Sequence, residues 1–270
     1  MSNPITNIGD IVGRRGRASR GARTSTDERG FDELVRAVNL YDLSDVPVAS
    51  GRIVPGALIR CAKLDNLSAR EWATLMNGCN FGLVVDLRTE AEIPVRSGMF
   101  SKDVRSACTP CAYINLPLDG LGLLMTPLQR KSGIAWVRMR KKLWADPEVM
   151  FKKMYAAMVT DPNNMHNLSR FFSVAQSKRD GALAWHCAQG TDRTGVVSAL
   201  LLEILGAKRA DIVEHYAACY AHDTPADPRP SLLAAYDAIE GAYGSVQEYL
   251  THGLGVTPEA QHSLQQRFLA

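Results

Sequence analysis

The sequence contains no long apolar run. Its longest apolar stretches, such as residues 196–202, fall far short of the roughly 20 residues that a helix needs to span a bilayer, so we expect no integral membrane segment. The first 30 residues also lack the apolar core of a secretory signal peptide. These absences favour a cytoplasmic protein, and they leave open its export as an effector through a specialised secretion system.

Net charge is small and is concentrated at the N-terminus. The 270 residues carry 31 basic and 28 acidic side chains, and residues 1–30 alone hold six arginines against three acids. The remaining residues hold 25 of each sign. A neutral body argues against nucleic acid as the main ligand, because such binding depends on many phosphate contacts. We interpret residues 1–30, which are rich in arginine and glycine, as a disordered leader and residues 31–270 as one folded domain.

The cysteines lack the regular spacing of a disulfide framework, so reduced thiols are the default. The six are Cys61, Cys79, Cys108, Cys111, Cys187 and Cys219. Cys108 and Cys111 have the spacing of a redox pair, but a strand pattern follows them, whereas a helix follows the cysteines of a thioredoxin-like motif. We interpret these two as thiols without a redox role.

Strand and helix patterns alternate from residue 50 onward. Apolar strands are expected over residues 81–87, 112–118 and 182–186. Residues 131–178 are mainly helical, with breaks before Pro147 and Pro162. The order of elements predicts an α/β fold with a central, mostly parallel sheet flanked by helices, a helical insertion before the strand at 182–186 and a helical C-terminus.

Two helix ends can be located from local signals. Ser68 and Glu71 have the spacing of a capping box, which predicts a helix that begins at residue 69. Asn77 and Gly78 are expected to end it. A second helix is predicted from Thr194 to residue 205, where a glycine follows.

One segment carries most of the chemical information. Residues 186–195 read His-Cys-Ala-Gln-Gly-Thr-Asp-Arg-Thr-Gly, so five residues separate Cys187 from Arg193 between a predicted strand and a predicted helix. A loop that enters a helix directs free backbone N–H groups inward, and the helix dipole adds partial positive charge. Such a loop binds a phosphate dianion and favours a cysteine thiolate.

Each part of this loop has an expected role. Cys187 is the nucleophile, and the planar guanidinium of Arg193 donates hydrogen bonds to two phosphate oxygens. His186 is expected to brace the loop, and Thr194 to donate a hydrogen bond to the sulfur. The phosphate-binding residues are predicted to be Ala188, Gln189, Gly190, Thr191, Asp192, Arg193 and Thr194. This chemistry needs neither a metal ion nor a cofactor.

The reaction also needs an acid that protonates the leaving oxygen and then a base that activates water. Asp192 lies inside the loop, and Asp119 follows a predicted strand whose end should face the same crevice. We rank these two above Asp86, which ends another strand and has local partners available, and Asp146, which precedes a proline. The residues alone do not decide between Asp119 and Asp192.

The loop resembles the His-Cys-x-x-Gly-Lys-Asp-Arg-Thr-Gly signature of the bacterial and fungal branch of the tyrosine phosphatase superfamily. The resemblance covers roughly residues 38–269, and its weaker motifs occur in the expected order: residues 39–43, 55–60, 85–88, 243–250 and 255–257. It implies a phosphatase-like fold and activity on phosphotyrosine, in some members with dual specificity or activity on phosphoinositides. It also implicates Asp119 and Asp192 in acid and base catalysis or in supporting it.

Two positions depart from the family pattern. Thr191 replaces the loop lysine, which removes a cation and weakens the case for highly charged phosphoinositides. Tyr41 replaces an arginine in the opening motif.

The leading hypothesis is a cysteine-dependent protein tyrosine phosphatase that acts through a phosphocysteine intermediate. A phosphoinositide phosphatase and a catalytically weak phosphate-binding module are the alternatives. An interaction protein led by the arginine-rich leader ranks last.

Overall fold

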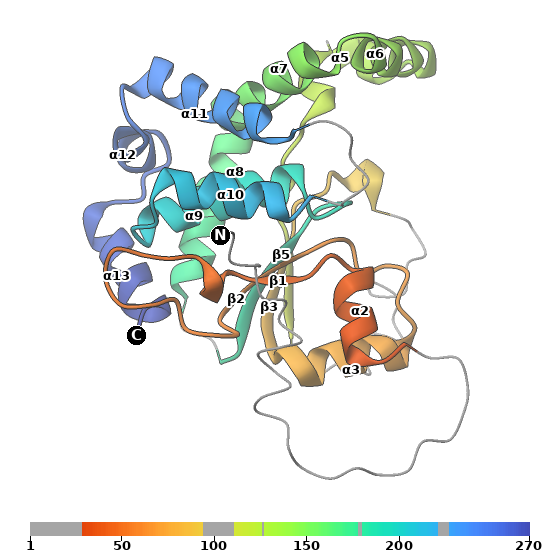
Figure 1. Cartoon of the computed structure of the whole chain (residues 1–270). Coiled ribbons are helices and arrows are strands. Elements are labelled where there is room, and N and C mark those ends of the chain that lie inside the picture. Colours follow the sequence, from red (N-terminus) through yellow and green to blue (C-terminus); the bar gives the residue numbers. More distant parts are fainter. Residues whose placement is uncertain (1–28, 94–110, 126, 178–179, 221–226) are drawn as a thin grey trace.

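The computed structural model describes residues 29–93, 111–125, 127–177, 180–220 and 227–270 (Figure 1). Its centre is a five-stranded sheet in the order β1-β2-β5-β3-β4. The strands are β1 (Tyr41–Asp42), β2 (Leu58–Cys61), β3 (Phe81–Asp86), β4 (Ala112–Asn115) and β5 (Ala182–His186). Only β1, at one edge, pairs antiparallel with its neighbour, so the sheet is mostly parallel, as predicted.

Alternate side chains of β5 enter two separate hydrophobic cores. Ala182 and Ala184 face a core shared with α2 (Phe31–Ala37) and α3 (Ala69–Cys79). Leu183 and Trp185 face the larger core on the other side of the sheet. Every residue of β5 is buried, as is typical of a central parallel strand that is covered on both faces.

The helices on the side of the larger core come from the insertion before β5 and from the C-terminal half of the chain. The helical insertion and the helical C-terminus predicted from the sequence are therefore confirmed. The insertion contains α5 (Pro127–Arg130), α6 (Gly133–Ala145), α7 (Pro147–Thr160) and α8 (Pro162–Gln176). After β5 come α9 (Asp192–Ile204), α10 (Arg209–Ala218), α11 (Arg229–Tyr243), α12 (Val246–Glu248), the π-helix η5 (Tyr249–Gly253) and α13 (Pro258–Phe268). Short 3-10 turns are η1 (Leu43–Asp45), η2 (Glu90–Glu92) and η4 (Leu121–Leu124).

The two predicted breaks in the insertion are helix caps. Asp146 accepts a hydrogen bond from the N–H of Val149, and Asp161 accepts from two N–H groups at the start of α8. In both cases the following proline occupies the first helical position, where no N–H is needed. The Asp-Pro pairs therefore divide the insertion into successive helices.

Two predicted element ends are wrong. The helix after Ser68 does not stop at Asn77 and Gly78 but continues to Cys79, and Asn80 ends it in a left-handed conformation with φ of +50°. Gly78 is a packing residue instead: a Cβ there would lie 2.1 Å from the ring of Phe31. The strand predicted over 112–118 ends at residue 115, the last residue in regular register with β3.

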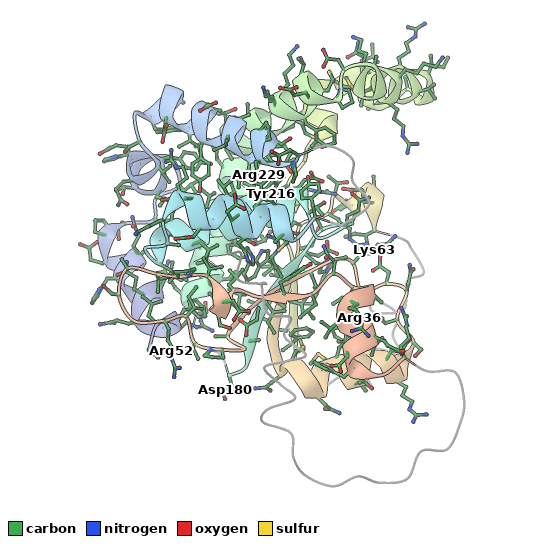
Figure 2. All side chains as sticks on the ribbon, in the orientation of Figure 1. Arg36, Arg52, Lys63, Asp180, Tyr216 and Arg229 are labelled. Atoms are coloured by element: carbon green, nitrogen blue, oxygen red, sulfur yellow. The ribbon has the colours of Figure 1, made fainter. Side chains whose placement is uncertain are left out.

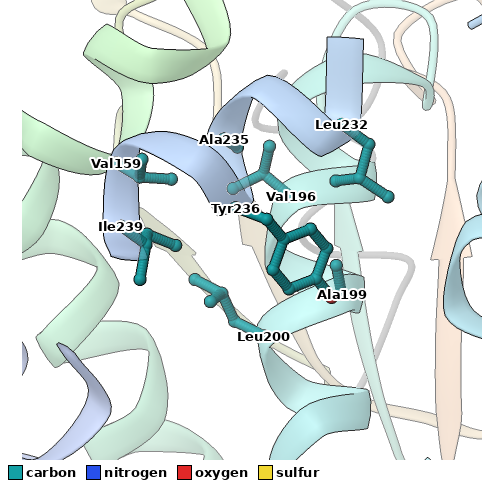
Figure 3. Close-up of a pocket in the computed structure, with 8 residues that line it drawn as sticks. All are labelled: Val159, Val196, Ala199, Leu200, Leu232, Ala235, Tyr236 and Ile239. Atoms are coloured by element: carbon teal, nitrogen blue, oxygen red, sulfur yellow. The ribbon is translucent and has the colours of Figure 1, made fainter. Parts of the chain in front are cut away.

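A small apolar cavity lies between α7, α9 and α11 (Figure 3). Its volume of about 10 Å³ is close to that of a single water-sized sphere, so it is too small for an organic substrate. Among the described helices, none is both long enough and apolar enough to cross a membrane.

The close contact between Gly78 and Phe31 predicts opposite effects of two glycine-to-alanine substitutions. Gly78→Ala should lower the free energy of unfolding by about 1–3 kcal/mol, because the added methyl group must displace the Phe31 ring. Gly241→Ala is the control, since it lies inside α11 with no atom within 4 Å of the added Cβ. It should raise stability by about 0.5–1 kcal/mol through helix propensity. Urea denaturation of both variants would measure the difference, and equal shifts would contradict the packing role of Gly78.

Candidate active site

The motif predicted to carry the chemistry lies where β5 ends and α9 begins. Cys187 directly follows β5 and is 2% exposed, and Thr191 is the residue before α9. Gly190 has φ of +73°, and a Cβ added there would lie 2.6 Å from backbone atoms of Cys61 and Ala62. Both the backbone conformation and the packing therefore require glycine at this position.

Arg60 on β2 fixes the second half of the loop of residues 187–193, on the side of the loop that faces the sheet. Its guanidinium is fully buried, and Nη2 donates hydrogen bonds to the carbonyls of Gly190 (2.7 Å) and Thr191 (3.3 Å). Hydrogen bonds from a charged donor are among the stronger ones in proteins. These two carbonyls are therefore fixed toward the sheet.

The first half of the loop is held in the same way. The carbonyl of Ala188 accepts from the backbone N–H of Lys63 (3.3 Å), and that of Gln189 accepts from Nδ2 of Asn39 (3.4 Å). In a trans peptide the C=O and the following N–H point in opposite directions. The carbonyls of residues 188–191 therefore all point toward the surrounding protein. The N–H groups of residues 189–192 point in the opposite direction, where they can bind an anion.

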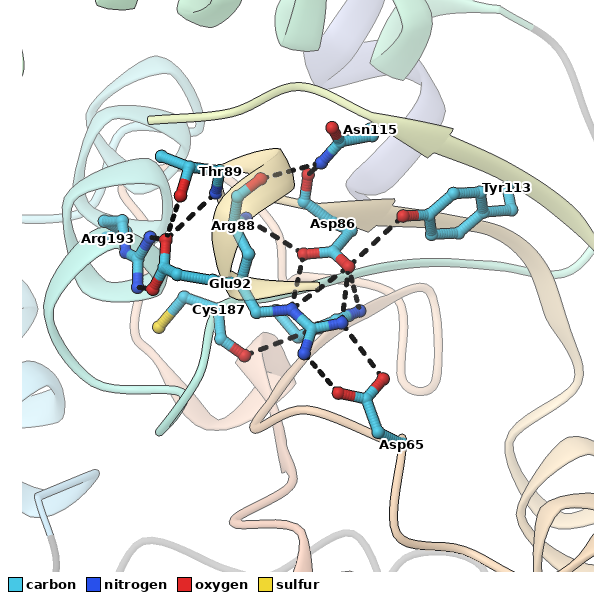
Figure 4. Close-up of polar contacts among 10 residues, drawn as sticks. Asp65, Asp86, Arg88, Thr89, Glu92, Tyr113, Asn115, Cys187 and Arg193 are labelled. Atoms are coloured by element: carbon cyan, nitrogen blue, oxygen red, sulfur yellow. Dashed lines mark hydrogen bonds and ion pairs between the residues drawn. The ribbon is translucent and has the colours of Figure 1, made fainter. Parts of the chain in front are cut away.

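Arg193 is held by Glu92 so that one edge of its guanidinium is left for a ligand (Figure 4). Nη1 and Nη2 donate to the two carboxylate oxygens of Glu92 at 2.6 and 2.7 Å, and Nη1 also contacts the carbonyl of Leu118 (3.4 Å). Among the described residues, the N–H of Nε and the second N–H of Nη2 have no acceptor. These two groups share one edge and form a fork that matches two phosphate oxygens.

The ion pair keeps both partners charged. Burial raises the pKa of Glu92, but the hydrogen bonds and charge of Arg193 outweigh it and lower this pKa to about 2. Burial lowers the pKa of Arg193, whereas Glu92 and then the Cys187 thiolate raise it, with a net rise above its usual range.

Asp119 is positioned through its backbone. Asn164 on α8, which is 2% exposed, accepts from the N–H of Asp119 and donates to its carbonyl, both at 2.9 Å. The preceding residue, Leu118, supplies the carbonyl that contacts Arg193, so Asp119 lies beside the loop. A Cβ at Gly122 would lie 2.5 and 2.6 Å from the Asp119 carboxylate oxygens, so glycine there leaves room for this side chain.

Asp192 is surrounded by hydroxyl groups. Tyr155 on α7 donates to Oδ1 at 2.6 Å, Tyr220 donates to the same oxygen, and Thr191 donates to Oδ2 at 3.2 Å. Burial, together with the charge of Asp192, raises the pKa of both tyrosines, so they remain protonated donors. The carboxylate thus joins the start of α9 to α7 and to the end of α10.

Asp86 is fully buried and is surrounded by hydrogen-bond partners (Figure 4). It accepts hydrogen bonds from the backbone and the guanidinium of Arg88 and from the hydroxyl of Tyr113. Arg88 in turn forms two hydrogen bonds to Asp65. Asp86 therefore fixes the end of its strand. Asp146 caps α7, so neither of these two lower-ranked carboxylates is placed as an acid beside Cys187.

His186 and Thr194 flank the loop. Nδ1 of His186 contacts the carbonyl of Cys187 (3.1 Å), and Nε2 lies 3.7 Å from Asp86. Burial lowers the pKa of His186, so its ring is neutral at neutral pH. The hydroxyl of Thr194 is buried without a hydrogen-bond partner in the described part of the chain. Its predicted bond to the Cys187 sulfur is not formed here and stays a prediction.

No prediction from the sequence covers Glu92, Asn164, Tyr155 or Tyr220. For Glu92 a local signal exists: Thr89 and Glu92 have the spacing of a capping box, and Thr89 does donate to the Glu92 carboxylate. That signal does not reveal Arg193, which lies 101 residues further along the chain.

Within the part of the chain that the structure describes, no three His, Cys, Asp or Glu side chains gather as a metal site. Cys108 lies outside the described residues. Cys111 precedes β4, and its thiol contacts the carbonyl of Ala112 (3.4 Å).

Comparison with known proteins gives one family and two relatives. Residues 33–270 match the model of the tyrosine phosphatase family. The chain is 26% identical over 187 residues to a tyrosine-protein phosphatase of Nostoc commune, which covers 68% of this chain and 55% of that protein. It is 25% identical over 242 residues to a protein of Cupriavidus necator named "Putative tyrosine-protein phosphatase", covering 81% and 82%. The chain thus spans about half the length of the Nostoc relative.

The Arg193–Glu92 ion pair predicts that Glu92→Gln lowers kcat/KM by about 10- to 100-fold. Without the carboxylate of Glu92, the guanidinium of Arg193 is no longer oriented toward a bound phosphate. Hydrolysis of an aryl phosphate would measure it. Glu90→Gln on the same turn removes the same charge from an exposed residue and should leave kcat/KM unchanged. Equal effects of the two substitutions would contradict a positioning role for Glu92.

Proposed function

The chain belongs to the tyrosine phosphatase family, and we propose that it hydrolyses phosphotyrosine in proteins through a phosphocysteine on Cys187. One observation carries the proposal. The loop N–H groups and the edge of Arg193 that Glu92 does not bind belong to the loop that begins at Cys187, directly after β5. That arrangement can hold a phosphate dianion with its phosphorus next to a nucleophilic sulfur.

In the first step the Cys187 thiolate attacks phosphorus. An S–P bond forms while the bond from phosphorus to the tyrosine oxygen breaks, and an acid transfers its proton to that oxygen so that tyrosine leaves neutral. The Arg193 fork and the loop N–H groups donate to the three equatorial oxygens, where negative charge is spread in the transition state.

In the second step a water molecule replaces the departed tyrosine. The same carboxylate, now ionised, takes a proton from the water as its oxygen attacks phosphorus. The S–P bond breaks, the thiolate is regenerated and inorganic phosphate leaves. The buried hydroxyl of Thr194 is a suitable donor to the departing sulfur once it turns toward it.

We assign the acid and base role to Asp119. Its backbone is fixed next to the carbonyl that contacts Arg193, which supports a place close to the leaving oxygen. Asp192 instead accepts hydrogen bonds on both oxygens from Tyr155, Tyr220 and Thr191, which supports a structural role for its carboxylate.

The two departures from the family pattern support a protein substrate over a highly charged inositol lipid. Thr191, at the position of the loop lysine, is 6% exposed and directs its hydroxyl to Asp192. The hydroxyl of Tyr41 donates to the carbonyl of Ala218 (3.3 Å). Neither position therefore supplies a cation for additional phosphate groups.

The proposal predicts that phosphate is released from a phosphotyrosine peptide in the presence of EDTA, and that Cys187→Ser abolishes this release. Rapid quenching with labelled peptide should trap phosphate on the wild-type cysteine. A phosphoserine peptide in the same assay tests dual specificity. An active Cys187→Ser variant would overturn the mechanism, and an inactive wild type would favour a phosphate-binding module.

The assignment of Asp119 predicts a dependence on the leaving group. Asp119→Asn should slow hydrolysis of a phosphotyrosine peptide by about 100-fold or more, because a tyrosine phenolate leaves poorly without a proton. The loss should be much smaller on p-nitrophenyl phosphate, whose phenol is acidic. The limb of the pH–rate profile that falls with rising pH should also disappear.

Two further variants test this assignment. Gly122→Ala crowds the Asp119 carboxylate, so it should reproduce the leaving-group dependence in milder form. Asp192→Asn should lower thermal stability and affect both substrates equally, since its contacts join helices. A leaving-group dependence in Asp192→Asn instead of Asp119→Asn would reverse the assignment.

A further inference from the structure

The helical hairpin of α5 and α6 differs in charge from the rest of the molecule. Residues 127–145 contain six basic residues and no acidic residue. Outside this hairpin and the first 30 residues, the other 221 residues carry 19 basic and 25 acidic side chains. Figure 1 shows α5 and α6 at the edge of the molecule, beyond α7 and away from the sheet. A strongly basic element thus projects from an otherwise acidic body.

The described cations of the hairpin form no ion pair with any carboxylate in the part of the chain that the structure describes. Lys131, Arg138, Arg140, Lys141 and Lys142 are all exposed, and none forms an ion pair with a described carboxylate. By contrast, exposed Lys152 on the neighbouring α7 pairs with Glu148 at 2.7 Å. Unpaired charges of one sign on a single helix favour an external surface of the opposite sign.

The same hairpin exposes large aliphatic side chains. Leu128 is 80% exposed, Ile134 is 68% exposed and Val137 is 56% exposed. Ile134, Val137 and Lys141 follow the i, i+3, i+7 spacing, so they share one stripe of α6. In Figure 2 the side chains of α6 spread outward from the helix.

A groove of about 560 Å³ runs between α5 and α6. Its lining includes the apolar side chains of Met125, Leu128, Ile134 and Met139, the polar side chains of Gln129 and Ser132, and the cations Arg138 and Lys142. Apolar side chains beside cations match a group with an apolar chain and an anionic head.

We propose that the α5–α6 hairpin docks on anionic lipid bilayers, with its exposed aliphatic side chains in the interfacial layer and its cations on the lipid phosphates. A helix with interspersed basic and apolar residues is typical of segments that lie in the membrane interface. An acidic protein or a nucleic acid would match the cations but would not need these exposed apolar residues.

The docking surface is independent of the proposed catalysis. No described side chain of α5 or α6 contacts Cys187, Arg193 or Glu92 through a hydrogen bond or ion pair. The link between the two regions is η4, which connects Asp119 to α5. Failure of docking would therefore leave the phosphatase proposal untouched, and the reverse also holds.

The test is flotation of the full chain with vesicles of phosphatidylcholine alone or with 30% phosphatidylglycerol. Binding is expected only with the anionic lipid and should weaken as salt is raised. Replacing Arg138, Arg140, Lys141 and Lys142 by Gln should reduce the bound fraction by about tenfold or more, because each cation near an anionic surface contributes substantially to binding. Ile134→Ser with Val137→Ser should also reduce it.

The arginine-rich leader provides a matched control. Replacing Arg14, Arg15, Arg17 and Arg20 by Gln removes the same charge and should leave vesicle binding unchanged. All variants should hydrolyse p-nitrophenyl phosphate at the wild-type rate, which also reports that they are folded. Equal binding to both lipids, loss of binding only in the leader variant, or binding of polyglutamate or RNA without vesicle binding would overturn the proposal.

Discussion

The buried guanidinium of Arg60 sets the geometry on which the rest of the site depends. By accepting the charge-assisted bonds of Arg60, the carbonyls of Gly190 and Thr191 turn toward the sheet, and the intervening N–H groups turn toward the ligand. Arg60 forms no ion pair with a described carboxylate, and its Nε and Nη1 have no hydrogen-bond partner in the described part of the chain. Positive charge therefore remains under the loop and favours an anion above it.

Three buried or half-buried arginines around Cys187 illustrate how pairing determines what a cation can do. Arg88 is bonded to both Asp65 and Asp86, so its charge is neutralised and it serves to fix the end of β3. Arg193 is paired on one edge only, by Glu92, which orients it and leaves the other edge for a ligand. Arg60 contacts carbonyls alone. All three side chains carry the same guanidinium group, and only their partners differ. Arg88 supports the end of a strand, Arg193 keeps one edge available to a ligand, and Arg60 leaves positive charge beside the loop.

The sequence allowed the fold class, the position of the loop and the two Asp-Pro breaks to be predicted, because each depends on neighbours within a few residues. Cys187, Gly190 and Arg193 lie in one short motif, and Asp146 and Asp161 cap the helices that their prolines begin. The partners of the loop could not be predicted in this way. Glu92 and Asn164 act across long stretches of chain, and no local pattern encodes such pairings. The prediction that Gly78 ends a helix is wrong for the same reason. Its neighbour Phe31 lies on another helix, and packing against that ring overrides the usual tendency of glycine to end a helix.

The hydroxyl cluster at Asp192 has a mechanical consequence for the insertion. Tyr155 joins the middle of α7 to the first turn of α9, while Asp146 caps the N-terminal end of α7, directly after α6. The eight residues between them, 147–154, form continuous helix, and the nine-residue step from Asp146 to Tyr155 spans about 13 Å. α7 is thus a rigid spacer that is fixed at one point to the loop after Cys187. Anything that holds the hairpin in place also fixes the distance between that loop and the anchoring plane. Under the proposed function, this distance would decide which phosphorylated segments reach Cys187.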